Sequence, residues 1–97
     1  MTDLATLEVS TFTPLIGETF RVRTADREIE LVLHEASALG KAVRQGGAFS
    51  LVFRGDDGLE IAQQLCPVHH RAIGEISLFL VPIGPLGEGM GFEAVFT

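Results

Sequence analysis

The sequence contains no tryptophan, no tyrosine and only one cysteine, Cys66, among its 97 residues. Trp and Tyr supply the amphipathic anchors that enrich protein interfaces, so an interface of this chain would depend on Phe, Leu, Met and Arg. A single cysteine cannot close an intramolecular disulfide, and nothing in the pattern requires an oxidising compartment. No apolar run reaches the ~20 residues that a membrane helix needs, and the first residues lack the basic and apolar regions of a secretory signal. These absences predict a cytoplasmic protein without a membrane partner.

Positive charge is also scarce. Seven Lys and Arg stand against 13 Asp and Glu, which gives a net charge of −6, and the basic residues are scattered along the sequence. This balance repels the phosphates of nucleic acids and argues against a nucleic-acid partner. What the chain has in quantity is apolar residues, at 46% of the total, with seven Phe among them. That is enough for the core of one domain, and we expect residues 1–97 to form a single β domain.

Alternation of apolar and polar residues, with a period of two, is typical of half-buried strands and recurs along the chain. The segment at 74–82 is apolar on both faces, which predicts a central strand that is covered on both sides. No long helix is indicated, and Ser37 could cap at most one helical turn, through Val43. The predicted fold is therefore all-β, a six-stranded antiparallel barrel or small sandwich with at most one short helical turn. Its strands are expected at 19–25, 28–36, 48–55, 65–70, 74–82 and 91–97.

The first two strands predict a hairpin in a defined register. If residues 26–27 form its turn, Phe20 lies opposite Leu33 on the apolar face. On the solvent face, Arg23 then lies opposite Glu30, with opposite charges paired. A slip by one residue would set apolar side chains against polar ones, so the pattern excludes it.

Four segments carry a resemblance to a known family. They are FTPLIGETF at 12–20, FSLVFRG at 49–55, and LFLVPIG followed by FEAVF within 78–96. The chain resembles a family of small bacterial proteins of unknown function, in which F-x-P-L-x-G-x-x-F, F-S-L-x-F-x-G, L-F-L-V-P and E-A-V-F motifs recur. It departs from that family at 64–67, QLCP, and at Phe92, two places where the relatives commonly carry a tyrosine. The resemblance implies a small β domain without an assigned activity, encoded near phage-tail-like or fibre proteins, so its partner could be such an assembly.

The glycine-rich stretch at 84–91, GPLGEGMG, could suggest a phosphate-binding loop. Such a loop needs a following Lys-Ser/Thr or a helix N-terminus, whereas here a strand follows and Glu88 repels phosphate. The stretch is therefore interpreted as a hairpin connection. A connection over 83–91, about nine residues, is longer than a minimal hairpin needs and predicts a contact surface with Met90 at its tip. Its predicted interaction residues are Gly87, Glu88 and Met90.

Cysteine and histidine raise the question of catalysis or metal binding. Cys66 and His70 lie four residues apart, roughly 13 Å on an extended strand, which is too far for a thiolate and its base. A catalytic pair would need His34, or a bend at Pro67, which itself suggests an edge strand or a bulge. Adjacent His69 and His70 point to opposite faces of a strand and cannot jointly hold one metal. We expect an inert, partly buried cysteine and predict no catalytic residue, metal site or cofactor; whether these side chains converge is left open.

Charged residues of the first hairpin could also form a carboxylate site for acid–base chemistry. Such residues are more typical of the solvated face of a hairpin, and we interpret them so. They are Glu28, Glu30, Glu35, Arg21 and Arg23.

By elimination, the sequence predicts a structural or protein-interaction module. It would present an edge strand and the loops at 37–47 and 83–91 to a protein partner, or to a second copy in a homo-oligomer. One alternative is a small-molecule carrier whose barrel holds an apolar ligand, although seven Phe should fill the interior. A less favoured alternative is a hydrolase or metal-binding protein that uses Cys66 and the histidines.

Overall fold

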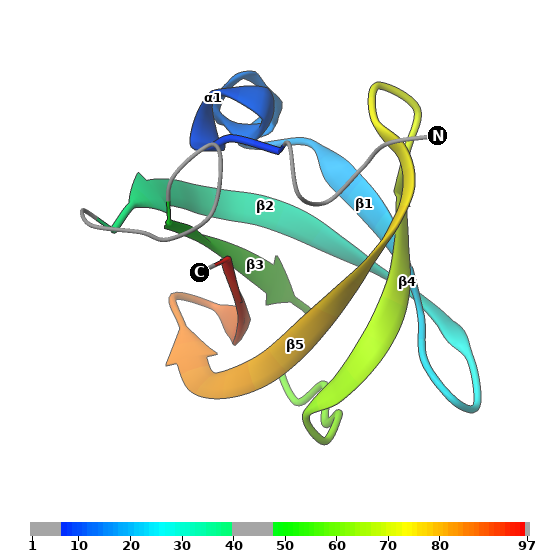
Figure 1. Ribbon diagram of the computed structural model, residues 1–97. Coiled ribbons are helices and arrows are strands. Elements are labelled where there is room, and N and C mark those ends of the chain that lie inside the picture. The colour runs from blue at the N-terminus through cyan, green and yellow to red at the C-terminus, as the bar shows by residue number, and fades with distance from the viewer. Residues whose placement is uncertain (1–6, 40–47, 97) are drawn as a thin grey trace.

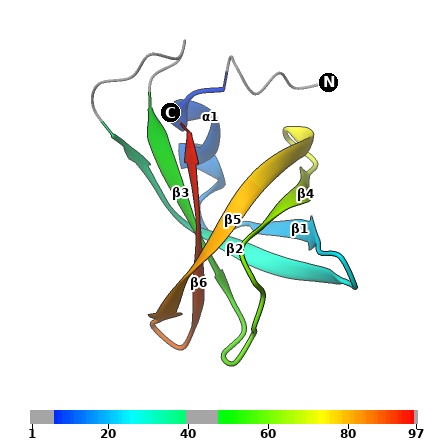
Figure 2. The same ribbon diagram turned by 60° about the horizontal axis from the view of Figure 1, so that its bottom comes forward.

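The computed structural model describes residues 7–39 and 48–96, which form six strands and a short helical segment. All strand pairs are antiparallel, in the order β1-β2-β3-β6-β5-β4, and β4 pairs again with β1 to close a barrel (Figure 1 and Figure 2). The predicted six-stranded antiparallel fold is confirmed, and it is a barrel rather than a sandwich. The strands are β1 (Thr19–Arg23), β2 (Glu28–Ala38), β3 (Phe49–Gly55), β4 (Gln64–His70), β5 (Gly74–Leu86) and β6 (Gly89–Phe96).

Closure of the barrel removes the edge strand that the sequence predicted. β4 pairs with β5 along its whole length, and it pairs with β1 through Arg21–His69 and Val22–Val68. We call these two residue pairs the β1–β4 seam. Each strand in the described part of the chain therefore has two neighbours, and the prediction of a free edge is wrong. Pro67 pairs with Ser77 of β5 without a bulge. It directly precedes Val68, the last β4 residue at this end of the seam, so the N–H that proline lacks is not needed for a further registered pair with β1.

The β1–β2 hairpin lies two residues away from the predicted register. Phe20 lies opposite Leu31. Thr24 fixes the turn, since its backbone N–H donates to the Arg27 carbonyl at 2.8 Å and its hydroxyl donates to the Asp26 carboxylate at 3.0 Å. The turn thus comes one residue earlier than predicted. A shift by two keeps every side chain on its predicted face, so the alternation pattern could not have revealed it.

Inward-facing side chains of all six strands fill the barrel, as expected for a small chain with seven Phe. Aromatic rings contribute the largest volumes, and Phe20 and Phe53 meet edge to face with ring centroids 5.4 Å apart. The largest side chains that are fully buried are Phe12, Phe20, Phe49, Phe53, Phe92, Leu31, Leu33 and Leu51.

A helical segment at residues 9–15, which the sequence analysis did not predict, covers the barrel end where β3 begins and β6 ends (Figure 2). It consists of α1 (Val9–Phe12) and the 3-10 turn η2 (Thr13–Leu15). Phe12 is wholly buried, with its ring centroid 5.8 Å from that of Phe49 and 6.1 Å from that of Phe96. Ser37, the predicted cap of a helical turn through Val43, belongs to β2, and the part of that turn from residue 40 onward lies outside the described residues. No helix in the described ranges has the length and apolar character to cross a membrane.

The segment predicted as a loop over 83–91 is almost entirely strand. β5 runs to Leu86 and β6 starts at Gly89, so only the two-residue turn at 87–88 connects them. Gly87 has φ of +59°, as the first position of a type II′ turn requires. In such a hairpin Leu86 and Gly89 exchange hydrogen bonds, so the nitrogen of Pro85 points away from β6 and no donor is missed. The interpretation of the glycine-rich stretch as a hairpin connection is confirmed, and the prediction of a nine-residue loop is wrong.

β5 is apolar on both faces, but only its inner face is covered. The inward Ile76, Leu78 and Leu80 are at most 4% exposed. On the outer face, Phe79 is 51% exposed and Ile83 is 47% exposed. The prediction of a strand covered on both sides is therefore wrong for the described chain, because a closed barrel has only one interior.

Candidate functional site

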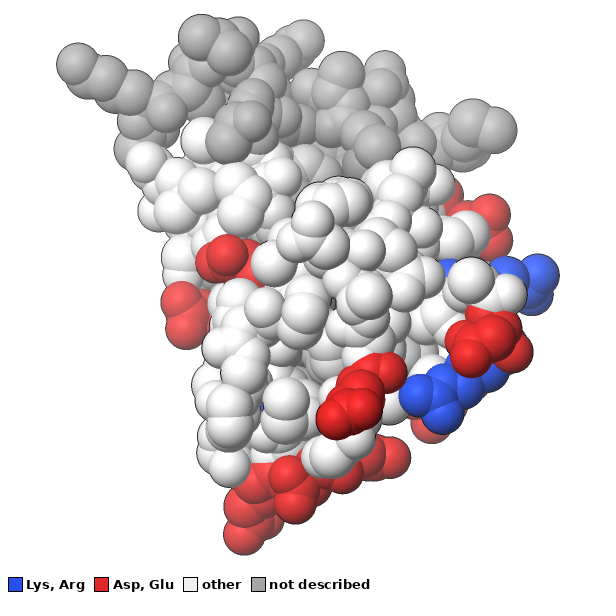
Figure 3. All heavy atoms as spheres, turned by 90° about the horizontal axis from the view of Figure 1, so that it is seen from below, with Lys and Arg blue, Asp and Glu red and all other residues white. Residues whose placement is uncertain are grey.

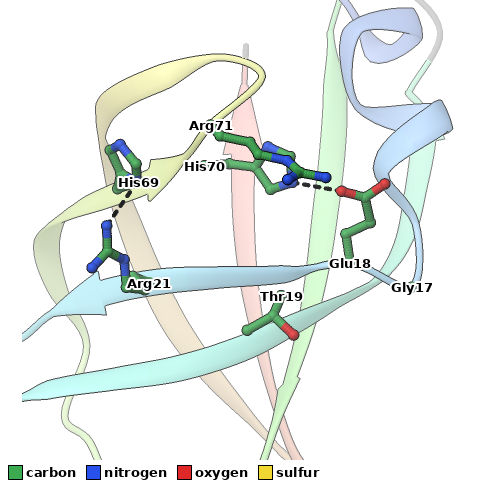
Figure 4. A pocket seen from close by; sticks show the side chains of 7 residues that line it. All are labelled: Gly17, Glu18, Thr19, Arg21, His69, His70 and Arg71. Carbon is green, nitrogen blue, oxygen red and sulfur yellow. Dashed lines mark hydrogen bonds and ion pairs between the residues drawn. The ribbon is translucent and has the colours of Figure 1, made fainter.

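An open cleft of about 430 Å³ lies beyond the Arg21–His69 pair, at the end of the β1–β4 seam opposite to Pro67 (Figure 4). One wall comes from the start of β1 and the residues before it, and the other comes from the end of β4 and the turn that follows. We call it the seam cleft. Its lining consists of Gly17, Glu18, Thr19, Arg21, His69, His70 and Arg71.

A β-bulge at Gly17 directs Glu18 toward the cleft. The N–H of Gly17 donates to the carbonyl of Leu33 at 2.8 Å, and the N–H of Leu33 donates to the carbonyl of Glu18 at 3.0 Å. Gly17 and Glu18 thus lie opposite the single residue Leu33, which is the pattern of a β-bulge whose first residue is glycine. Gly17 adopts φ of +91°, a left-handed conformation that side chains disfavour, although an added Cβ would meet nothing within 4 Å. The glycine of FTPLIGETF is therefore required for its backbone conformation rather than for space.

His70 is the buried member of the cleft, at 6% exposed, and its ring packs on Phe20 with centroids 4.7 Å apart. The N–H of Ala72 donates to His70 Nδ1 at 3.0 Å, and His70 Nε2 lies 2.7 Å from Glu18 Oε1. Because a backbone N–H can only donate, we assign Nδ1 as the acceptor and the ring proton to Nε2, which donates to Glu18. Both ring nitrogens are thus engaged. His70 joins the turn after β4 to the start of β1 and has no nitrogen left to act as a base.

The outer rim of the cleft is cationic. Arg21 Nη2 lies 3.5 Å from His69 Nδ1, and since a guanidinium group can only donate, that nitrogen accepts. Arg71 is exposed at the start of the turn after β4. In the described part of the chain, neither Arg21 nor Arg71 forms an ion pair with a carboxylate. Two guanidinium groups and one carboxylate, Glu18, therefore give the cleft lining a formal charge of +1.

This positive charge contrasts with the far end of the barrel. In Figure 3, which views the molecule from below, Asp and Glu predominate over Lys and Arg. The connection from β3 to β4 contributes the exposed Asp56, Asp57 and Glu60. A chain with a net charge of −6 thus carries a local positive site at the seam.

A family model described as a domain of unknown function, DUF6916, matches residues 7–96. The chain belongs to this family. The match extends from just before α1 through β6, so the DUF6916 unit is the whole barrel with its helical segment. No curated protein and no solved structure matches the chain. The resemblance to a family of unknown function is confirmed, and the DUF6916 description carries no activity that could be transferred to the seam cleft.

The structure does not bring the candidate cysteine and histidines together. Cys66 and His70 both face inward on β4, which continues without a bulge through Pro67. Cys66 is fully buried, and this burial raises the pKa of its thiol, which disfavours the reactive thiolate. His69 and His70 lie on opposite faces of β4, as predicted, while His34 is exposed on β2. Within residues 7–39 and 48–96, no three His, Cys, Asp or Glu side chains are grouped to hold a metal ion.

The predicted interaction residues lie at the β5–β6 turn. Gly87 and Glu88 form this turn and are exposed. Met90 is not at the tip, because it lies in β6 opposite Pro85 and packs partly buried against the core. Of the other predicted loop, 37–47, only the first three residues are described, and two of these belong to β2.

A second candidate surface is apolar and lies on the outside of the barrel. Phe79, Val81 and Ile83 occupy successive outward positions of β5, and Leu65 of β4 lies opposite Phe79. We call these four residues the β5 stripe. Leu65 is 66% exposed and Phe79 is 51% exposed, so residues 7–39 and 48–96 leave much of this surface uncovered.

The charged hairpin residues form a solvated face, as interpreted from the sequence. Arg23 lies opposite Glu28 rather than Glu30, and the two charged groups are 3.8 Å apart with both side chains at least half exposed. No motif or alternation pattern in the sequence pointed to Glu18 or Arg71. Glu18 meets His70, which is 52 residues away, and the only local signal was the glycine that precedes it.

Proposed function

We propose that this barrel is a protein-interaction module and that the β5 stripe is its contact surface. The observation that supports this proposal is the exposed outer face of a strand that is apolar on both sides. Removing apolar surface from water contributes about 25 cal/mol per Å², and contiguous exposed apolar side chains on small proteins commonly mark interaction sites. Leu65 and Phe79 are cross-strand neighbours, so a single partner side chain could cover both.

The partner is expected to combine an apolar strip with a basic surround. Glu93 of β6 lies opposite Val81 of the stripe, and Glu75 is exposed on the same strand as Phe79. A second copy fits less well, because two chains that each carry a net charge of −6 repel each other. A homo-oligomer, a phage-tail-like or fibre assembly as partner, and a cytoplasmic location stay predictions from the sequence.

The two alternative functions have weaker support. A carrier would need interior space, yet inward Phe side chains, among them Phe20 and Phe53, occupy the barrel. A cysteine hydrolase would need a thiolate beside a free imidazole nitrogen, whereas burial favours the thiol of Cys66 and both nitrogens of His70 have partners.

Photo-crosslinking in the source cell tests the proposal. A photoreactive phenylalanine analogue replaces Phe79 in one variant and His34 in a matched control, since β2 lies on the opposite wall of the barrel from β5. We expect one protein to crosslink through position 79 and not through position 34. With that protein purified, the double variant Leu65→Ser/Phe79→Ser should weaken binding by about tenfold or more, as hot-spot residues do, and His34→Ser should not.

Three outcomes would contradict the proposal. They are the absence of any crosslink at position 79, equal crosslinking at both positions, and binding that the double variant leaves intact. A crosslink to a second copy of this chain would mean that the β5 stripe mediates self-association rather than binding to a basic partner. Binding to the partner should also weaken with added salt, because its basic surround faces Glu93 and Glu75.

A further inference from the structure

One half of β5 has a neighbouring strand on one side only. Its pairs with β4 extend from Leu80 back to Gly74, whereas its pairs with β6 stop at Val81–Glu93. Beyond that pair β6 continues toward α1 and β5 leans toward β4, so the two strands diverge (Figure 2). Residues 75–80 of β5 therefore have no second strand paired with them in the described part of the chain. We call this stretch the open half of β5.

The backbone groups of this stretch point alternately to β4 and to the open side. Ser77 lies opposite Pro67 of β4. Because proline has no N–H, this pair cannot exchange two hydrogen bonds, and the N–H and C=O of Ser77 point away from β4. Residues two positions away point to the same side, so Glu75 and Phe79 do so as well. Val81, the next residue of this series, pairs with β6, in agreement with that direction.

Outward side chains of the open half determine the chemistry of a segment that would lie along it. Glu75 and Ser77 are exposed, and Phe79 is 51% exposed. Val95 of β6, also 51% exposed, lies as far beyond the last registered pair of these strands as Phe79 does. Among the described residues Glu75 forms no ion pair. Apolar surface thus lies at one end of the stretch and an unpaired carboxylate at the other.

We propose that the open half of β5 accepts an extended segment of the partner protein as an added strand, an inference that rests on the proposed function as an interaction module. Added strands gain affinity from main-chain hydrogen bonds and specificity from alternate side chains. Antiparallel pairing is the more stable direction, and every registered strand pair of this barrel has it. An antiparallel segment would place an apolar side chain opposite Phe79 and a Lys or Arg, four residues later, opposite Glu75.

A second copy of this chain fits the open half poorly. Two copies that pair antiparallel through Glu75, Ser77 and Phe79 of each would set the Glu75 carboxylate against the Phe79 ring. Both chains would also carry a net charge of −6. The occupant is therefore a segment with an apolar residue followed by a basic one.

Hydrogen exchange of the unaltered protein tests whether the edge is open. The amides of Ile76 and Leu78 point to β4, whereas those of Ser77 and Phe79 point to the open side. We expect the second pair to exchange at least about tenfold faster than the first, measured by NMR after correction for intrinsic rates. Equal protection of all four amides would mean that another part of the chain already covers the edge, and it would overturn the proposal.

A synthetic peptide, acetyl-Ser-Ile-Ser-Thr-Ser-Lys-Ser-amide, is the binding probe. It places Ile opposite Phe79, Thr opposite Ser77 and Lys opposite Glu75, and we expect saturable shifts of these three amide signals with a Kd of about 1 mM or lower. N-methylation of the Thr removes the donor to Ser77 and should weaken binding about tenfold. N-methylation of the Ser that follows is the matched control, because its N–H points away from β5.

A charge exchange tests the register of the added strand. Glu75→Lys should weaken binding of the Lys peptide about fivefold, and it should strengthen binding of the same peptide with Glu in place of Lys. Glu60→Lys makes the same change of net charge at an exposed position between β3 and β4. It should leave the binding of both peptides unaltered.

Failure of this proposal differs from failure of the proposed function. Ser77→Pro removes a donor that the barrel does not use, so the variant should fold and bind the peptide and the crosslinked partner about tenfold more weakly. If Ser77→Pro binds that partner normally while Leu65→Ser/Phe79→Ser does not, the β5 stripe is a contact surface without an added strand. That result overturns this inference and retains the proposed function. Absence of a crosslink at position 79 contradicts the proposed function alone when the two N-methylated peptides still differ.

Three results on the peptides overturn the proposal, whether or not Ser77→Pro folds. One is the absence of a saturable shift up to about 10 mM peptide, which is above the millimolar range of weak specific binding. Another is equal weakening by N-methylation of the Thr and of the Ser after it. The third is an equal effect of Glu75→Lys and Glu60→Lys on peptide binding.

Discussion

Replacing Glu18 with alanine should lower the free energy of unfolding by about 1–2 kcal/mol, because it leaves a buried ring N–H of His70 without a partner. The two groups are 2.7 Å apart, and the His70 side chain is only 6% exposed. An unsatisfied buried donor costs about 1–3 kcal/mol, and we take the lower part of that range because water can reach the half-exposed Glu18 position. Glu18→Gln should cost less than about 1 kcal/mol, since its amide oxygen can still accept from Nε2.

Urea unfolding at pH 7 with linear extrapolation measures these differences. In a domain of this size, each kcal/mol should also lower the midpoint of thermal unfolding by about 4–8 °C. Glu28→Ala is the matched control, because Glu28 pairs with Arg23 at 3.8 Å between two exposed side chains. Its cost should stay within about 0.5 kcal/mol.

Two results would refute this reasoning. One is equal destabilisation by Glu18→Ala and Glu28→Ala, which would mean that burial of His70 adds nothing to the pair. The other is an NMR spectrum of His70 in which Nδ1 rather than Nε2 carries the proton of the neutral ring. The assigned tautomer depends on the Ala72 N–H as donor to Nδ1, at 3.0 Å.

Three further predictions concern stability and use the same unfolding assay. Gly17→Ala should cost about 1–2 kcal/mol because alanine is strained at positive φ, and an unchanged stability would show that the bulge relaxes freely. Phe12→Ala should cost about 3–5 kcal/mol as a fully buried aromatic ring, and a loss below about 1 kcal/mol would exclude α1 from the core. Burial raises the pKa of Cys66, so the unfolded chain ionises first as pH rises. The free energy of unfolding should be insensitive to this group below about pH 8.5 and fall as pH rises through the folded pKa. Cys66→Val should abolish this decrease in the free energy of unfolding at high pH. If the decrease persists in the variant, other groups cause it.

The sequence predicted which residues face the core, because alternation is a local property of each strand. Phe20 and Val22 point inward as expected, although their partners on β2 differ from those predicted. The register of the β1–β2 hairpin could not be predicted from alternation, since it depends on the hydrogen bonds of Thr24 within the turn. The four residues of α1 are too few for a helical period to emerge.

The glycine-rich stretch at 84–91 misled the prediction at β5, and the distance along the sequence between its two segments concealed the seam cleft. The glycines predicted a long connection, yet β5 continues to Leu86, because Pro85 directs its nitrogen where no ladder bond is needed. The residues of the seam cleft lie in two segments about 50 residues apart, as the separation of 52 between Glu18 and His70 shows. Only barrel closure brings these segments together, and no local pattern encodes closure.

The short β1–β4 seam also has a consequence for the order in which the chain folds. The barrel consists of two three-stranded meanders, β1-β2-β3 and β4-β5-β6, each built from hairpins between successive strands. They meet along β3 and β6 over seven residue pairs, and along β1 and β4 over two. Because closing a long loop costs entropy before contacts compensate it, the longer junction should assemble first and the seam last. The same asymmetry makes the seam the first place to open in the native state, so amide hydrogens of Arg21 and His69 should exchange faster than those of Leu51 and Ala94.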